Sequence, residues 1–208
     1  MTIPPSIPTR SVFAAAAAAF RELVGRVGPD GWDEPGLGVW SVRDLVGHTS
    51  RSLTTIETYL GVPSPGEPLD GPVDYFRRAR VALADPDAVA QRGRDAGAAL
   101  GDDPAARVAE LADRVTALVD ASPGDESVGT PLGTMTLAGY LPTRVFELTV
   151  HGIDLARALD VDPPVTLGPG IGLSCALAGG LAADSPDAVA VLMALTGRTE
   201  LPRGFTLL

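Results

Sequence analysis

Apolar residues recur along this chain with the three-to-four-residue spacing of amphipathic helices, and turn-forming residues separate the periodic segments. Strong helix formers dominate the long segments, whereas clusters of β-branched or aromatic residues are rare. The pattern predicts an all-α fold whose main body has about four long helices, the third interrupted at Asp85-Pro86. The helical ranges that we expect are about 9–27, 41–60, 73–100, 103–121 and 142–159.

The start of the second helix carries the clearest local signals. Ser41 with Asp44 three residues later resembles a capping box, although Asp replaces the usual Glu. Trp40 and Leu45 occupy the two positions of a hydrophobic staple around the same start. We therefore expect this helix to begin at Ser41.

Residues 165–208 form a shorter part of the pattern, with two short helices separated by Asp184-Ser185-Pro186 and then an extended tail. We expect a helical bundle over residues 1–164 and a small C-terminal helical segment over 165–208 that packs on it. Gly168-Pro169-Gly170 lacks a nucleotide-binding pattern and is expected to be a loop, as are other segments rich in glycine and proline.

Composition narrows the classes of function. The 208 residues carry a net charge of −10, all their basic residues are Arg, and there is no basic stripe, so nucleic acid and anionic membrane are poor partners. No window approaches the roughly 20 apolar residues of a membrane span. Cys175 is the only cysteine, which excludes an intramolecular disulfide; we expect a buried structural thiol in a cytoplasmic protein.

The chain has only two histidines, and their settings suit one site. His48 lies beside the apolar stripe of the second helix, at the edge expected of a pocket. Glu147 and His151, at i and i+4, share one helix face at a separation of roughly 6 Å. Two imidazoles and one carboxylate form the ligand set of many catalytic zinc sites, which keep one position open. Ferrous iron or nickel can use the same set.

The helix that carries His151 has apolar residues on both sides of a narrow polar stripe, Arg144, Glu147, His151 and Asp154. A helix that is apolar on both sides is buried on both sides, so the stripe should line an internal cleft, where a cation would satisfy its charges. In the alternative interpretation, Glu147 pairs with Arg144 and His151 with Asp154 as local contacts on a solvated face. A Ser-His-Asp triad stays open, but no Gly-x-Ser-x-Gly elbow is present.

Two motifs give a family resemblance that covers about residues 8–160. Gly-Val-Trp-Ser-Val-Arg-Asp-Leu-Val-Gly-His, residues 38–48, resembles the first metal-ligand segment of the DinB-like superfamily. Residues 144–156 resemble its second segment, in the version of the mycothiol-dependent maleylpyruvate isomerase-like proteins, which have Glu where Glu147 stands. Ala-Leu-Thr-Gly-Arg-Thr-Glu-Leu-Pro, residues 194–202, is similar to the close of many such chains.

The resemblance implies a four-helix bundle with a short C-terminal helical appendage, and a divalent metal, usually zinc, on His48, Glu147 and His151. The thiol mycothiol would coordinate the open position as cosubstrate. The isomerase type carries a larger α/β C-terminal domain than residues 165–208, which argues against maleylpyruvate itself as the substrate. Asp154 would orient His151, and Arg144 would bind a substrate carboxylate.

We therefore expect a metal-dependent, mycothiol-dependent enzyme that activates the thiol for attack on a small-molecule electrophile, as an isomerase or a thiol S-transferase, in a monomer or homodimer. Three alternatives remain. The bundle could be a non-catalytic metal-binding module with a regulatory or ligand-binding role, a metal hydrolase that needs no thiol, or a metal-free interaction domain.

Overall fold

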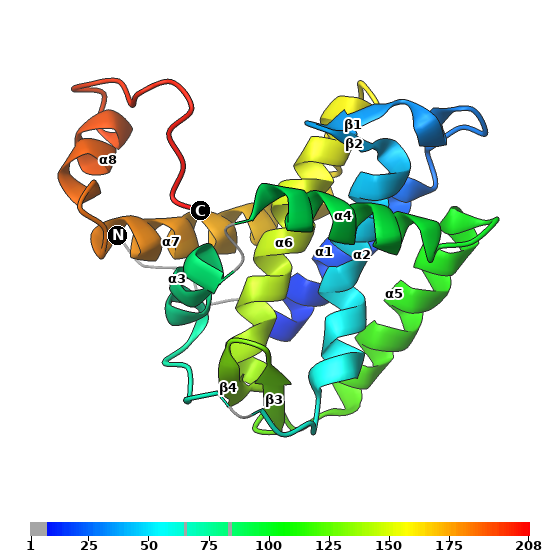
Figure 1. Cartoon of the computed structure of the whole chain (residues 1–208), viewed down its shortest axis with the longest axis horizontal. Helices are drawn as coiled ribbons and strands as arrows, with labels where there is room; N and C mark the ends of the chain where they lie inside the picture. The colour runs from blue at the N-terminus through cyan, green and yellow to red at the C-terminus, as the bar shows by residue number, and fades with distance from the viewer. Residues whose placement is uncertain (1–7, 65, 83–84) are drawn as a thin grey trace.

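Helices dominate the computed structural model, which describes residues 8–64, 66–82 and 85–208. Within these residues the chain forms eight α-helices and two antiparallel strand pairs (Figure 1). The helices are α1 Thr9–Val24, α2 Val42–Tyr59, α3 Pro72–Ala82, α4 Pro86–Ala98, α5 Pro104–Ala121, α6 Leu137–Ala158, α7 Gly168–Ala183 and α8 Ala188–Leu195. The strands are β1 Pro35–Leu37, β2 Trp40–Ser41, β3 Ser127–Thr130 and β4 Gly133–Thr136, with 3-10 turns at Gly31–Asp33 and Val165–Leu167.

Four helices close a ring around the core, because α1 packs on α5 and α6, and α2 packs on the same two helices. The all-α bundle expected from the sequence is thereby confirmed. The ring is filled by large apolar side chains, and the alanines of α1 let its neighbours approach closely. The fully buried members include Phe13, Phe20 and Leu23 of α1, Leu45, Leu53 and Ile56 of α2, Val115 of α5, and Leu141, Leu148 and Leu155 of α6.

The interrupted third helix, 73–100, was wrongly expected to belong to the main body. It is two helices that lie outside the ring: α3 packs on α6 and α7, and α4 packs along α2. The reason is a lack of apolar surface, since α3 buries only Phe76 and α4 only Gly93 and Gly97. Neither helix presents the continuous apolar stripe that a bundle position needs.

The start of α2 follows the sequence prediction. The Ser41 hydroxyl accepts a hydrogen bond from the Asp44 backbone N–H at 3.2 Å, and Asp44 Oδ2 accepts one from the Ser41 N–H at 3.2 Å. Trp40 and Leu45 are both buried in the core. The capping box and the two staple positions therefore hold the first turn of α2, and with it the residues that follow.

Helix α6 begins five residues earlier than predicted, because Pro142 lies inside it instead of at its first position. A β-hairpin that the sequence analysis missed leads into the helix, with Val128 opposite Met135, and Thr136 caps it by accepting from the Gly139 N–H. Strands of four residues are too short for their alternation to stand out from a loop. Proline is favoured in a first turn, which explains the misplaced start.

The C-terminal segment corrects two expectations. Gly168-Pro169-Gly170 is the first turn of α7 and not a loop, with proline in a position that needs no backbone donor. At Gly170 a side chain would collide with Thr149 of α6, so the glycine permits close packing of the two helices. Cys175 is exposed and not buried.

One segment, Val165–Ala183, is long and apolar enough to cross a membrane by length and composition, with one third of its residues buried. The expectation that no window approaches this length was therefore wrong, since glycine and alanine make α7 apolar without bulky side chains. Core helices of soluble proteins can have the same composition. In this structure Leu177 and Leu181 of α7 pack against Phe76 and Phe146 of α3 and α6.

Candidate metal centre

His48 of α2 meets Glu147 and His151 of α6 at one place in the bundle. The ligand atoms of the three side chains all lie within 4.8 Å of one another. The two imidazole rings are perpendicular, with their centroids 4.9 Å apart. The structure thus brings together three of the residues singled out in the sequence, across about a hundred positions of chain.

Packing of α2 against α6 creates this meeting. Leu45 and Leu53 on α2, and Leu148 and Leu155 on α6, are fully buried on either side of the three polar groups. The polar side chains at this seam are mostly covered: exposure is 22% for Glu147, 16% for His151 and 17% for Asp154. The polar stripe of α6 therefore faces the interior, as the flanking apolar faces predicted, and not bulk solvent.

Hydrogen bonds hold the His151 ring between two carboxylates. Its Nε2 lies 3.4 Å from Glu147 Oε2, and its Nδ1 lies 3.2 Å from Asp154 Oδ2. Burial lowers the pKa of His151, but the bonds to Asp154 and Glu147 outweigh it and raise this pKa to about 9. Burial raises the pKa of Glu147, yet the bond from His151 and the charge of Arg144 bring it to about 2. Glu147 is thus a carboxylate at neutral pH.

His48 differs from its neighbours because, among the described residues, its side chain has no hydrogen-bond partner. Its Nδ1 is buried without a hydrogen bond to any residue that the structure describes. Burial and the positive charge of His151 lower the pKa of His48 to about 4, so this ring is neutral and keeps a free lone pair. Trp40 stacks on the ring, with centroids 4.5 Å apart, and donates from Nε1 to the Ala90 carbonyl of α4 at 3.0 Å.

Arg144 is held by aromatic side chains and not by Glu147. Its guanidinium lies 4.7 Å from the ring centroid of Tyr140 and 5.4 Å from that of Tyr75. It also donates two hydrogen bonds, from Nη2 to the Tyr75 hydroxyl at 3.2 Å and from Nε to Thr143 Oγ1 at 3.0 Å. Among the described residues it has no carboxylate within ion-pair distance. Of the two local pairings in the alternative interpretation, only that of His151 with Asp154 is present, and it is shielded from solvent.

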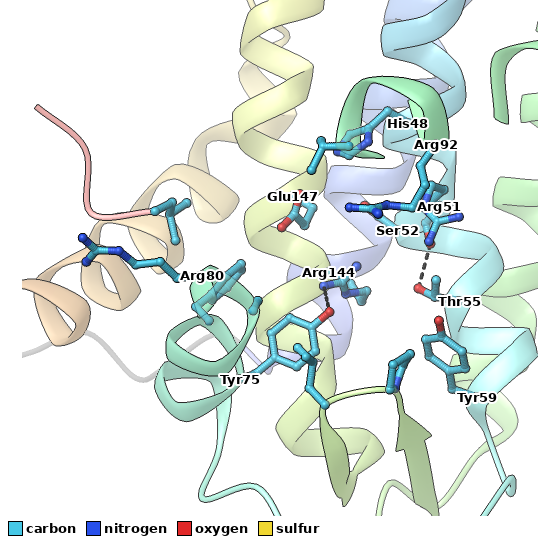
Figure 2. Close-up of a pocket in the computed structure, with 16 residues that line it drawn as sticks. His48, Arg51, Ser52, Thr55, Tyr59, Tyr75, Arg80, Arg92, Arg144 and Glu147 are labelled. Carbon is cyan, nitrogen blue, oxygen red and sulfur yellow. Dashed lines mark hydrogen bonds between the residues drawn. The ribbon is translucent and has the colours of Figure 1, made fainter. Parts of the chain in front are cut away.

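A cavity of about 510 Å³ is lined by two of the three donors, His48 and Glu147, and has the usual size of a small-molecule site. Figure 2 shows side chains of α2, α3, α4 and α6 converging on it. Sequence reasoning missed most of its lining. Arg51, Ser52, Thr55 and Tyr59 follow His48 on α2 and could have been found from the position of that histidine. The remaining lining residues come from elements whose placement the sequence does not reveal. They include Tyr75, Phe76, Arg80, Val89, Arg92, Leu132 and Leu208.

Comparison with protein-family models gives a match to the mycothiol maleylpyruvate isomerase N-terminal domain over residues 13–156. Comparisons with curated proteins and with solved structures gave no significant match. The matched range covers more than half of the chain and runs from α1 through α6, so it includes His48, Glu147 and His151. The chain therefore belongs to the mycothiol maleylpyruvate isomerase N-terminal domain family, which is one of the DinB-like families.

Proposed function

We propose that this protein is a zinc-dependent, mycothiol-dependent enzyme that activates the thiol for attack on an electrophilic substrate, as an isomerase or a thiol S-transferase. The observation that carries the proposal is the cluster of His48, Glu147 and His151, whose ligand atoms lie within 4.8 Å of one another beside a cavity. Membership of a mycothiol-related family supports the choice of thiol.

The donor set fits a divalent cation. Two imidazoles and one carboxylate leave a fourth position free in the tetrahedral arrangement that zinc prefers. The unpartnered Nδ1 and lowered pKa of His48 describe a neutral ring available to a cation. In the metal-free protein both ring nitrogens of His151 face carboxylates, and a bound cation would take the place of the Nε2 proton while Nδ1–H continues to donate to Asp154. Asp154 is therefore proposed to act through His151 as a positioning residue.

When bound, the metal would supply positive charge that stabilises a thiolate relative to a thiol. The protein's own residues would exclude water from the site and bind the substrate. The packed bundle restricts water around the donors, and the hydroxyls of Ser52, Tyr59 and Tyr75 line the cavity. Arg144 remains our candidate for pairing with a substrate carboxylate, although its Nε and Nη2 already donate to Thr143 and Tyr75.

We also infer that the enzyme works in the cytoplasm as a monomer or homodimer. In this proposal residues 1–164 are the metal-binding bundle, and residues 165–208 are a small helical segment packed on it. The packing of α7 on α6 and α1 supports this division.

The test is elemental analysis of protein purified without a metal-affinity tag, for the wild type, His151→Ala and Glu147→Gln. Glu110→Gln, the same chemical change on an exposed face of α5, is the matched control. We expect near-stoichiometric zinc in the wild type and the control, and its loss in both site variants. Absence of metal from the wild type after zinc is added back would refute the proposal.

Turnover with mycothiol and a panel of electrophiles then separates the remaining functions. We expect activity that needs both zinc and the thiol. Bound zinc without thiol-dependent turnover would indicate a non-catalytic module, and turnover without any thiol would indicate a metal hydrolase.

A further inference from the structure

All three tyrosines of the chain lie near Arg144, and their hydroxyl groups are used differently. Tyr140 is buried and donates from its hydroxyl to Thr55 Oγ1 at 3.0 Å, so its proton is engaged inside the bundle. Tyr59 lines the cavity, but its hydroxyl has no hydrogen bond to any residue that the structure describes. Tyr75 lines the same cavity, and its hydroxyl oxygen accepts a hydrogen bond from Arg144.

The bond between Arg144 and Tyr75 has a fixed direction. A guanidinium can only donate, so the 3.2 Å contact from Nη2 makes the Tyr75 oxygen an acceptor. The phenolic proton is therefore available to another group, and no residue in the described part of the chain receives it. Figure 2 shows the hydroxyl end of Tyr75 directed at Arg144 on α6, one turn before Glu147. The proton of Tyr75 is thus left for an acceptor inside the cavity.

Packing holds Tyr75 in place on α3, although this helix buries little apolar surface. Phe76, the next residue, is buried against Phe146 of α6, with ring centroids 5.0 Å apart. Arg78, one turn farther on, donates to the Leu132 carbonyl in the turn between β3 and β4 at 3.3 Å. These contacts fix α3 against α6 and the hairpin. A donor that is held in advance needs little reorganisation when charge develops beside it, which is the condition for electrostatic stabilisation in catalysis.

We propose that Tyr75 is a catalytic hydrogen-bond donor that stabilises negative charge on a carbonyl oxygen of the electrophile as the thiolate adds. The inference rests on the proposed function for the reaction. Arg144 is the positioning residue of this pair, because its bond to the Tyr75 oxygen orients the phenolic proton and polarises the hydroxyl as a donor. Nη1 of Arg144 has no hydrogen bond among the described residues and stays available for a substrate carboxylate.

The proposed step balances in atoms and charge. The thiolate sulfur gives an electron pair to the far carbon of a double bond conjugated with the carbonyl group, and a C–S bond forms. The electrons of the double bond move toward the carbonyl carbon, and those of the C=O bond move onto its oxygen. The negative charge thus passes from sulfur to oxygen, to which Tyr75 donates a hydrogen bond while keeping its proton. Rotation and reversal expel the thiolate and leave an isomer, whereas protonation of carbon by water leaves the conjugate and hydroxide.

The first experiment measures direct binding of 4-nitrophenolate by calorimetry, with the full chain as purified and at mildly alkaline pH. The charged oxygen of this probe stands for the charge that develops on the substrate. We expect Tyr75→Phe to weaken its binding by roughly tenfold to a hundredfold, which is the loss of one hydrogen bond to a charged group. 4-Nitroanisole has a similar shape but no charged oxygen, so its affinity should be the same for the wild type and Tyr75→Phe.

Tyr140→Phe is the matched control, because its ring also faces Arg144 but its hydroxyl donates to Thr55 inside the bundle. It should bind 4-nitrophenolate as the wild type does. The zinc content of both variants should equal that of the wild type. Unchanged affinity in Tyr75→Phe, an equal loss in Tyr140→Phe, a larger loss in Tyr59→Phe, or no binding of the probe to the wild type would overturn the proposal.

Kinetics distinguish failure of this inference from failure of the proposed function. With mycothiol and a substrate whose double bond is conjugated with a carbonyl group, Tyr75→Phe should lower kcat by about a hundredfold or more and leave KM nearly unchanged, as expected for removal of one oxyanion donor. A raised KM with unchanged kcat would show that Tyr75 only binds substrate, and would overturn the catalytic role. Absence of thiol-dependent turnover in the wild type would refute the proposed function, whereas loss of 4-nitrophenolate binding in Tyr75→Phe would still support the assigned donor.

Discussion

Gly93→Ala tests whether contact between α4 and Trp40 holds the candidate metal centre together. Gly93 lies against the Trp40 indole, and a Cβ added there would come within 2.5 Å of its Cε2 and Nε1. Ordinary contact begins at 3.4 Å, so the indole would have to retreat by about 1 Å. Movement of the ring would strain its bond to the Ala90 carbonyl and its stacking on His48.

The expected change in the free energy of unfolding of Gly93→Ala is the sum of opposing contributions. Overpacking a filled site costs about 1–3 kcal/mol, and loss of the indole hydrogen bond adds about 1 kcal/mol. Alanine returns about 1 kcal/mol through its higher helix propensity. We expect a net destabilisation of about 1–3 kcal/mol, which lowers the melting temperature by roughly 3–10 °C in a protein of this size.

Gly172→Ala is the matched control, because Gly172 lies in α7 with nothing within 4 Å of an added Cβ. The same substitution there should raise stability by about 0.5–1 kcal/mol. Both variants are melted as metal-free protein and then titrated with zinc. We expect weaker zinc binding in Gly93→Ala only, because His48 loses its stacking partner. A Gly93→Ala protein as stable as Gly172→Ala, with wild-type zinc affinity, would refute the reasoning.

Three further outcomes follow from the same structure. In metal-free protein the stability that His151 contributes is complete below its ordinary pKa of 6.5 and is lost as pH rises through about 9. Melting temperature should therefore fall across that range, and less steeply in Asp154→Asn. In Asp154→Asn, NMR titration should find a lower pKa for His151, because its strongest hydrogen bond is weakened. Leu53→Ala, fully buried in α2, should cost about 2–5 kcal/mol by urea unfolding, whereas Leu192→Ala, 61% exposed on α8, should stay within about 0.5 kcal/mol.

Local chemistry made parts of the site predictable. Glu147 and His151 are one helical turn apart, so the spacing alone puts them on one face, and the flanking apolar residues indicate that this face is covered. The start of α2 was equally predictable from the sequence, because the side chains of Ser41 and Asp44 accept hydrogen bonds from each other's backbone N–H groups within a single turn. Interactions between residues three or four positions apart can be inferred from the sequence, because local helix geometry alone brings those residues together.

Other features depended on surfaces that are distant in sequence. The exclusion of α3 and α4 from the ring, the hairpin before α6 and the exposure of Cys175 all escaped prediction. The position of α3 and α4 reflects competition among several elements for the same apolar surface, whereas the hairpin was missed because strands of four residues are too short to show alternation. The sequence shows that a segment such as α4, which buries only two glycines, is helical. It does not show which neighbouring helix has a surface complementary in shape to those glycines.

The sequence by itself determined that the protein is helical, where α2 begins, and that Glu147 and His151 share a face, because these follow from periodicity, capping and i,i+4 spacing. The sequence suggested His48 as a third ligand, but only the tertiary structure decided that it meets the other two and that Arg51 and Arg92 line the same cavity. The physical reason is that close packing of apolar stripes sets which helices become neighbours, and it also sets which polar groups are left together at the seam.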